Sequence, residues 1–197
     1  MPRVKQRTPE LRNRVLEVAL AALSEEGISR FTTRRVAERA GTSLPAVYEL
    51  FGDKAGLLRA MVFDGFRRLG GELERVPLTD DPVVDLERLV PVFRSFVRAN
   101  PRLAHLMFSR PFADLEPDPD DAAAGAAVRD AFTSRVRRCV DAGLLTGDVS
   151  DIAHAVLAMA QGLAAQEMAR WLGPSARDVE RRWAVGVRAL LDGLRPD

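Results

Sequence analysis

Apolar residues recur along this chain at intervals of three and four positions, the spacing of one face of an α-helix. The first such pattern covers residues 9–26, where Leu11, Val15 and Leu23 share a face and Gly27 follows as a stop signal. No segment alternates apolar and polar residues as a half-buried strand does. The pattern therefore predicts an all-α fold.

Start and stop signals divide the first part of the chain into four helices. Residues whose side chains accept hydrogen bonds from helix N-termini precede each apolar pattern, and these are Thr8, Thr32, Ser43 and Asp53. After the first helix, the pattern predicts helices over residues 33–40 and 44–51, and a longer one that begins at Lys54.

The rest of the chain carries further capping and proline signals. Asp81 caps a predicted helix over residues 82–99, which Pro91 should kink because proline has no N–H to donate. Asn100 is the predicted cap of a helix over residues 101–110.

Between this helix and the C-terminus, the sequence predicts one loop and three long helices. Residues 111–121 are rich in proline and acidic residues and are expected to form a loop that could gate a ligand site. Helices are expected over residues 122–142, 150–172 and 176–194, the last of them starting with a capping box of Ser175 and Asp178.

Charge is distributed unevenly along the sequence. Residues 1–68 carry 13 Lys+Arg and 8 Asp+Glu, whereas residues 69–197 carry 16 and 20. A basic first third suggests a polyanionic partner. Cys139 is the single cysteine, which excludes an internal disulfide and a cysteine-based zinc site, and no apolar run is long enough to span a bilayer. We expect a cytoplasmic protein with no membrane partner.

The two short helices over residues 33–51 have the spacing of a helix-turn-helix. Ala37 is small where the helices should cross, Gly41 stands where the turn favours positive φ, and Val47 is apolar where the second helix should pack on the first. Spacing alone is also compatible with an ordinary helical hairpin.

The run FTTRRVAERAGTSLPAVYELFGDK over residues 31–54, followed by Leu57 and Leu58, makes a resemblance specific. Residues 8–60 resemble the DNA-binding domain of the TetR family of bacterial transcriptional regulators, with Tyr48, Phe51 and Lys54 at its marker positions. Residues 75–197 are similar, more loosely, to the family's ligand-binding and dimerisation domain.

The resemblance implies a homodimeric regulator, more often a repressor than an activator, that leaves operator DNA when a small apolar or amphipathic effector binds. It implies a helix-turn-helix DNA-binding domain over residues 1–55 and a ligand-binding and dimerisation domain over residues 56–197. No cofactor or metal is expected.

The motif residues are expected to divide the work on DNA. Phosphate contacts are assigned to Thr33, Tyr48 and Lys54. Base contacts are assigned to Arg34 and to the start of the second helix, namely Thr42, Ser43, Leu44, Pro45 and Ala46. Glu49 either accepts from cytosine or faces solvent. Arg3, Lys5 and Arg7 form either a minor-groove arm or a tail without a role.

In the C-terminal part, apolar residues either form plain core or line an effector pocket. The candidate pocket residues are Phe93, Phe96, His105, Met107, Phe108, Phe132, Met159 and Gln161. The last two long helices either pack only within the chain or build a dimer. The candidate dimer residues are Ala158, Gly162, Ala165, Ala169, Trp183, Val187 and Leu190.

Other function classes find less support in the sequence. Arg137 and Arg138 could lower the pKa of the Cys139 thiol, but His105 and His154 have no visible link to it. The chain is therefore not expected to be an enzyme. A helical small-molecule carrier or sensor without DNA binding is the remaining alternative, and the first 60 residues argue against it.

Overall fold

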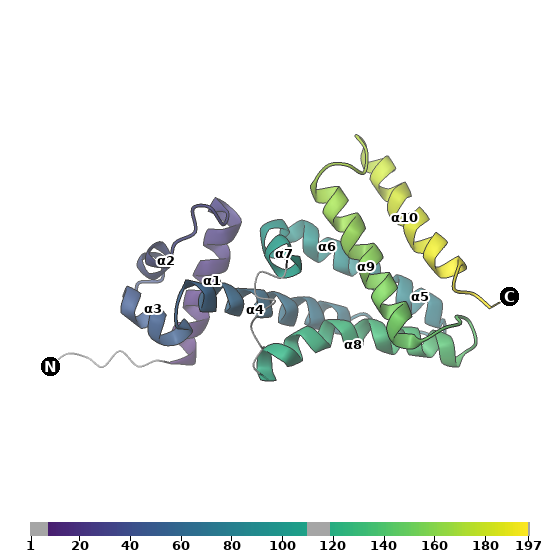
Figure 1. Ribbon diagram of the computed structural model, residues 1–197, viewed down its shortest axis with the longest axis horizontal. Coiled ribbons are helices and arrows are strands. Elements are labelled where there is room, and N and C mark those ends of the chain that lie inside the picture. Colours follow the sequence, from purple (N-terminus) through teal and green to yellow (C-terminus); the bar gives the residue numbers. More distant parts are fainter. Residues whose placement is uncertain (1–7, 110–118, 197) are drawn as a thin grey trace. The chain divides into compact units, whose positions relative to one another are not determined.

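A computed structural model describes residues 8–109 and 119–196 of the chain, and every regular element in these residues is an α-helix (Figure 1). The helices are α1 (Pro9–Glu26), α2 (Thr33–Arg39), α3 (Leu44–Phe51), α4 (Lys54–Glu74), α5 (Pro82–Glu87), α6 (Leu89–Ala99), α7 (Pro101–Phe108), α8 (Pro119–Asp141), α9 (Val149–Met168) and α10 (Ala176–Asp192). The predicted all-α class is confirmed. None of the described helices has the length and apolar character needed to cross a membrane.

Side chains at the N-termini explain why most helices begin where they do. Thr8, Thr32 and Ser43 each accept a hydrogen bond of 3.3 Å from a backbone N–H in the first turn of α1, α2 and α3. Asp81 accepts two such bonds at the start of α5. Helix α7 begins after Asn100 with Pro101 in its first turn, as predicted, but the Asn100 side chain makes no capping bond to it. Its ψ of 53° departs from the extended values of 139° to 152° that the three capping residues share.

The single kinked helix predicted over residues 82–99 is two helices. The helix is interrupted at Arg88, three residues before Pro91, although Arg88 itself keeps helical dihedral angles (φ −64°, ψ −21°), and it resumes as α6 at Leu89. In an unbroken helix the ring of Pro91 would collide with the carbonyl of Glu87, and one hydrogen bond would be missing. The break instead places Pro91 in the first turn of α6, where a backbone N–H is not needed.

Helix α9 ends at Met168, earlier than the predicted residue 172, because Arg170 adopts a φ of 61°. The N–H of Trp171 donates to the carbonyl of Gln166 at 2.9 Å, and the N–H of Arg170 donates to that of Glu167 at 3.0 Å. This pair of bonds is the Schellman motif, which usually has glycine at the left-handed position. An arginine at this position does not mark a helix end in the sequence, so the predicted end of α9 is too late.

Two other boundaries differ from the prediction by a few residues. Helix α8 begins at Pro119 rather than at residue 122, and α10 ends at Asp192 rather than at residue 194. The expected acidic loop over residues 111–121 lies mostly outside the described residues, and its last three residues belong to α8.

The chain forms two compact units, and each consists of two separate stretches of the sequence. The first contains the described residues up to Gly65 and those from Asn100 to Ser109, and the second contains residues 66–99 and the described residues from Pro119 onward. The predicted boundary after residue 55 concerned function and stays a prediction. Helix α7, expected with the second domain, belongs to the first unit because it packs on α1.

A buried carboxylate organises one end of the second unit. The side chain of Asp85 is fully buried, and it accepts hydrogen bonds from the N–H of Thr79 at 2.9 and 3.0 Å and from its hydroxyl at 2.7 Å. Arg138 of α8 also donates to Asp85, and donates to the Thr79 carbonyl at 2.7 Å. Burial alone would raise the pKa of Asp85, but these donors outweigh it and lower the pKa to about 2.

The first prediction tests this carboxylate. Asp85→Asn should lower Tm at pH 7 by roughly 5 °C or more, because Arg138 loses its carboxylate partner inside the protein. The stability that ionised Asp85 supplies is present above its ordinary pKa of 3.8 and is lost as pH falls through about 2. The Tm difference from wild type, measured by circular dichroism, should therefore shrink over that interval.

Asp80→Asn is the matched control, since Asp80 is an exposed acid in the same segment. It should leave Tm within about 1 °C of wild type at every pH. A difference between wild type and Asp85→Asn that stayed constant down to pH 2 would contradict the assigned pKa.

Candidate nucleic-acid interface

Helices α2 and α3 and the turn between them form the predicted helix-turn-helix. Val36, Ala37 and Val47 are all at most 2% exposed, so the two helices meet through small or branched apolar side chains. Gly41 has a φ of 65°, and the N–H of Thr42 donates to the carbonyl of Ala37 at 3.0 Å to close the turn. The roles expected for Ala37, Gly41 and Val47 are confirmed.

Ion pairs fix α2 against the C-terminal end of α1. The guanidinium of Arg39 donates to both carboxylate oxygens of Glu25, at 2.9 and 3.2 Å, and Arg35 lies 2.8 Å from Glu26. The bond to Arg39 also lowers the pKa of Glu25. Both arginines are therefore engaged within the protein, and the sequence alone did not reveal this because their partners lie on another helix.

The start of α4 completes the frame of the first unit. The carboxylate of Asp53 accepts a hydrogen bond of 2.8 Å from the N–H of Gly56, as the predicted cap requires. The ammonium of Lys54 lies 5.9 Å from the centre of the Phe31 ring, a cation–π contact that orients the lysine at the helix start.

Most of the predicted DNA-binding residues are accessible. Arg34, Ser43, Pro45, Tyr48 and Lys54 are exposed, with Tyr48 43% exposed. Leu44 and Ala46 are half-buried at the start of α3. On α3 the exposed residues lie opposite Val47, so the helix buries one face and presents the other.

Two predicted contacts do not fit the structure. Thr33 is only 5% exposed, so its hydroxyl is not available to a phosphate, although it occupies the first position of α2, where backbone N–H groups have no partner within the helix. The hydroxyl oxygen of Thr42 is buried and has no hydrogen-bond partner among the described residues. Thr33 is thus buried at the start of α2 and the Thr42 hydroxyl is buried in the turn, which spacing along the sequence could not show.

The remaining DNA-contact candidates are Glu49 and the residues of the N-terminal arm. Glu49 is exposed on α3 and takes part in an interaction within the chain. The arm residues Arg3, Lys5 and Arg7 lie outside the described residues.

The predicted effector-pocket residues are divided between the two units. In the second unit Phe93, Phe96 and Phe132 are at most 2% exposed, Met159 is half-buried and Gln161 is exposed. In the first unit Met107 is buried, Phe108 is half-buried and His105 is exposed. The two polar candidates, His105 and Gln161, thus lie at the surface and not among the buried aromatic rings.

The predicted dimer residues also divide into two groups. The small residues of α9, which are Ala158, Gly162, Ala165 and Ala169, are all exposed. Val187 and Leu190 are half-buried, and Trp183 is 4% exposed. The indole N–H of Trp183 donates to Glu167 at 2.7 Å, so this tryptophan is part of the packing within one chain.

The thiol of Cys139 is not activated. It is buried and lies 3.2 Å from the carbonyl of Pro82, to which it donates. Burial raises its pKa to about 11 and outweighs the lowering effect of the neighbouring Arg138. Among the described residues, no group of three His, Cys, Asp or Glu side chains could hold a metal ion.

The second prediction tests the turn. Gly41→Ala should destabilise the protein by about 1–2 kcal/mol, because an L-residue is strained at a φ of 65° even though nothing lies within 4 Å of the new methyl group. Gly71→Ala is the control, since Gly71 lies inside α4 with equally free space, and it should stabilise by about 0.5–1 kcal/mol. Urea unfolding measures both, and equal signs would show that the turn conformation is not required.

Comparisons with known protein families agree with this geometry. Residues 15–61 match the model of bacterial regulatory proteins of the tetR family, and residues 86–190 match that of the tetracyclin repressor-like C-terminal domain. The first match covers the helix-turn-helix, and the second covers more than half of the chain.

Individual relatives extend over nearly the whole chain. The HTH-type transcriptional regulator AcrR of Shigella flexneri is 27% identical, over 96% of this chain and 92% of its own. A solved protein of unknown function from Rhodococcus sp. RHA1 is 25% identical with a TM-score of 0.81 and covers 100% of both chains. A tetR-family regulatory protein from Rhodococcus RHA1, 19% identical over 96% of this chain and 100% of its own, shares the fold with a TM-score of 0.70. The chain belongs to the TetR family of DNA-binding transcriptional regulators.

Proposed function

We propose that this regulator is a repressor that binds operator DNA as a homodimer in the cytoplasm and leaves it when a small apolar or amphipathic molecule binds. The observation that carries the DNA-binding role is the orientation of α3, which buries Val47 and exposes Pro45, Tyr48 and Glu49. A helix so presented can enter the major groove.

Positioning on the phosphate backbone falls to Tyr48 and Lys54. Tyr48 lies within α3 and Lys54 at the start of α4, and both residues are exposed.

Base reading falls to Arg34 and to the first turn of α3. Arg34 is exposed, and its ion pair with Glu38 at 3.4 Å is also exposed, so this pair competes weakly with DNA. Leu44, Pro45 and Ala46 offer apolar contacts to thymine methyl groups, and Ser43 offers a hydroxyl.

Dimerisation falls to the small-residue surface of α9. Ala158, Gly162, Ala165 and Ala169 recur at three- and four-residue steps and are exposed in the single chain. Small side chains allow another helix to approach closely, and a two-fold axis needs only one such patch. Trp183 supports the dimer indirectly, because its hydrogen bond to Glu167 holds α10 on α9.

Effector release requires coupling between the units, and α4 is the element that contributes residues to both. Met61 and Val62 are buried in the first unit, while Leu69 and Leu73 are buried in the second. A ligand that shifts α4 therefore alters the frame on which α3 rests. Typical coupling is about 1–3 kcal/mol, and linkage requires operator DNA to weaken effector binding by the same factor.

The third prediction separates positioning from reading. Lys54→Ala and Tyr48→Phe should weaken operator and non-specific DNA alike, and Lys54→Ala should reduce the salt slope by about 1. Arg34→Ala should lower the preference for operator by about 1–3 kcal/mol, because a base contact is lost. Fluorescence anisotropy against operator and scrambled duplexes gives both quantities.

Arg177→Ala is the control for this series, since it removes an exposed arginine from α10. It should leave both affinities unchanged. If Arg34→Ala and Lys54→Ala changed the operator preference equally, the assignment of reading and positioning residues would be overturned. Unchanged affinity for both duplexes in Lys54→Ala, Tyr48→Phe and Arg34→Ala would contradict the proposed interface.

The fourth prediction tests the dimer. A methyl group built at Gly162 meets nothing within 4 Å, so Gly162→Leu can be accommodated within the chain. In a close helix–helix contact the same change costs about 1–3 kcal/mol by overpacking. Sedimentation should therefore show a weaker dimer with unchanged Tm of the monomer, together with weaker operator binding.

Gly125→Leu is the matched control, because Gly125 lies in α8 and its built methyl group also meets nothing within 4 Å. It should leave the sedimentation of the protein unchanged. An unaltered dimer in Gly162→Leu would move the interface away from this part of α9.

A further inference from the structure

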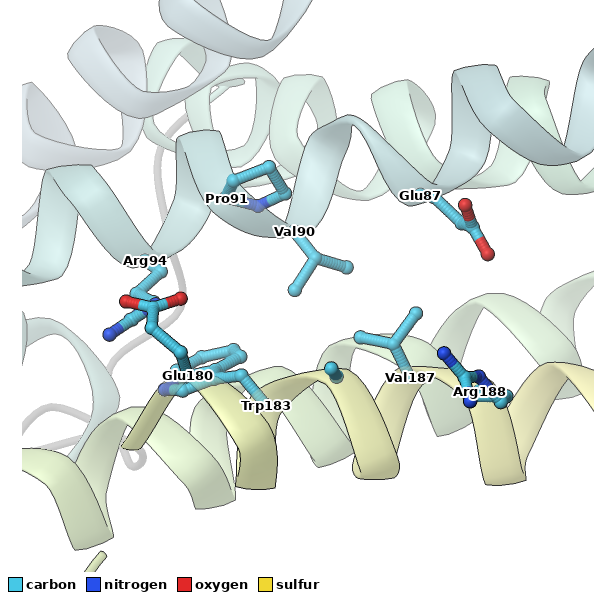
Figure 2. Close-up of a pocket in the computed structure, with 9 residues that line it drawn as sticks. Glu87, Val90, Pro91, Arg94, Glu180, Trp183, Val187 and Arg188 are labelled. Carbon is cyan, nitrogen blue, oxygen red and sulfur yellow. The ribbon is translucent and has the colours of Figure 1, made fainter. Parts of the chain in front are cut away.

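A groove of about 320 Å³ lies on the second unit between α5, α6 and α10 (Figure 2). Its volume reaches the lower end of the range of small-molecule sites, which begins at about 300 Å³. The residues that line it are Glu87, Val90, Pro91, Arg94, Glu180, Trp183, Ala184, Val187 and Arg188. None of the predicted effector-pocket residues is among them.

One end of the groove is closed by a network of ion pairs. Arg94 donates to both oxygens of Glu167, at 2.7 and 3.1 Å, and to Glu180 at 2.8 Å. Its guanidinium lies 5.2 Å from the centre of the Trp183 ring. These contacts hold α6, α9 and α10 together, and they leave the Arg94 side chain fully engaged.

The middle of the groove is apolar. Val90 and Val187 point toward one another across it, and Pro91 and Trp183 lie beside them (Figure 2). Ala184 also lines the groove, and its methyl group is too small to fill the space between the ion pairs and the far end. Pro91 and Ala184 are exposed and Val187 is half-buried, so an apolar segment placed there would remove their surface from water, which favours binding.

The far end carries one carboxylate and one guanidinium. Glu87 and Arg188 lie at the end opposite Arg94 and Glu180 (Figure 2), both are exposed, and within the described parts of the chain neither has an ion-pair partner. This pair can accept a hydrogen bond from a ligand and donate hydrogen bonds to it at the same place.

The charges that line the groove cancel. Glu87 and Glu180 supply two negative charges, and Arg94 and Arg188 supply two positive ones. A ligand with a net charge would lose its hydration without a net Coulomb gain, whereas a neutral head group that donates and accepts can satisfy both side chains at the open end.

We propose that this groove binds a neutral amphipathic molecule, with its apolar part between Val90 and Val187 and its hydrogen-bonding head between Glu87 and Arg188. The binding step needs no DNA and is tested without it, so its failure is distinct from failure of the DNA-binding proposal.

The fifth prediction uses three probes that share an eight-carbon chain length and differ in the head group: octanamide, octanoate and octylamine. Of the two tryptophans, Trp171 is 77% exposed and Trp183 lines the groove, so Trp171→Phe leaves Trp183 as the sole indole reporter. Octanamide should change its fluorescence saturably and bind about tenfold more tightly than either charged probe. No saturable change, or tighter binding of a charged probe, overturns the proposal.

Charge variants test where the head group lies. Arg188→Ala leaves one excess carboxylate and should shift the preference toward octylamine, which is protonated at pH 7, and Glu87→Gln should shift it toward octanoate, each by about fivefold or more. Arg177→Ala, on the same helix but outside the groove, should leave the ranking unchanged. An unchanged ranking in both groove variants contradicts the assigned head-group position.

A steric pair completes the test. Val187→Phe should fill the groove and abolish octanamide binding, whereas Val185→Phe, two residues away and 60% exposed, should not. If wild type fails to bind octanamide and Val187→Phe alters sedimentation, the groove is a contact between copies of the chain and the ligand proposal is wrong. Equal effects of the two variants on octanamide binding also contradict it.

Discussion

Helix α3 is eight residues long and buries only Val47 fully, so its position depends on the helices around it. A helix of this length is unstable alone in water, because too few hydrogen bonds offset its nucleation. The turn at Gly41, the ion pairs between α1 and α2 and the start of α4 at Asp53 together supply the missing support. Any presentation of α3 to DNA is therefore a property of the whole first unit.

The second unit depends on two carboxylates that each join several segments, Asp85 fully buried and Glu167 17% exposed. Asp85 joins the segment before α5 to α8, and Glu167 joins α9 to α6 and α10. Burial would raise the pKa of Glu167, but the hydrogen bonds from Arg94 and Trp183 outweigh it and lower the pKa. Both acids thus remain charged at neutral pH. Each carboxylate needs hydrogen-bond donors from several segments at once, so it fixes the positions of those segments relative to one another.

Local signals in the sequence predicted most of the helices. Helix caps and glycines act on backbone within a few residues, so their effect can be predicted from the local sequence. Examples are the caps Thr8, Thr32 and Ser43 and the glycines Gly27 and Gly41. The end of α9 escaped because an arginine occupies the left-handed position. The break at Arg88 was displaced from Pro91 because a proline disturbs the helix up to four residues before it.

The sites were predictable only where exposure follows from helical periodicity. Tyr48 and Lys54 are exposed as expected, but the hydroxyl of Thr42 faces inward because of how the turn packs. In the sequence Trp183 is a candidate dimer residue, yet in the structure its partners are Arg94 and Glu167. These partners lie on other helices, so the spacing of residues within α10 could not predict them. The groove escaped for the same reason, since residues far apart in sequence form its two sides.

The packing of the second unit limits how an effector can enter it. Phe93 and Phe132 have no exposed surface, and protein interiors are as densely packed as organic crystals, so a ligand among these rings must first displace them. That displacement uses binding free energy, but it also moves the helices that carry the rings. The groove beside α10 needs no such opening, so a ligand there gains affinity without moving the core. A molecule that releases DNA must favour one conformation over the other, and tight binding by itself does not shift the equilibrium. Opening the aromatic core therefore suits a switch, whereas filling a preformed groove suits a ligand that stabilises the existing arrangement.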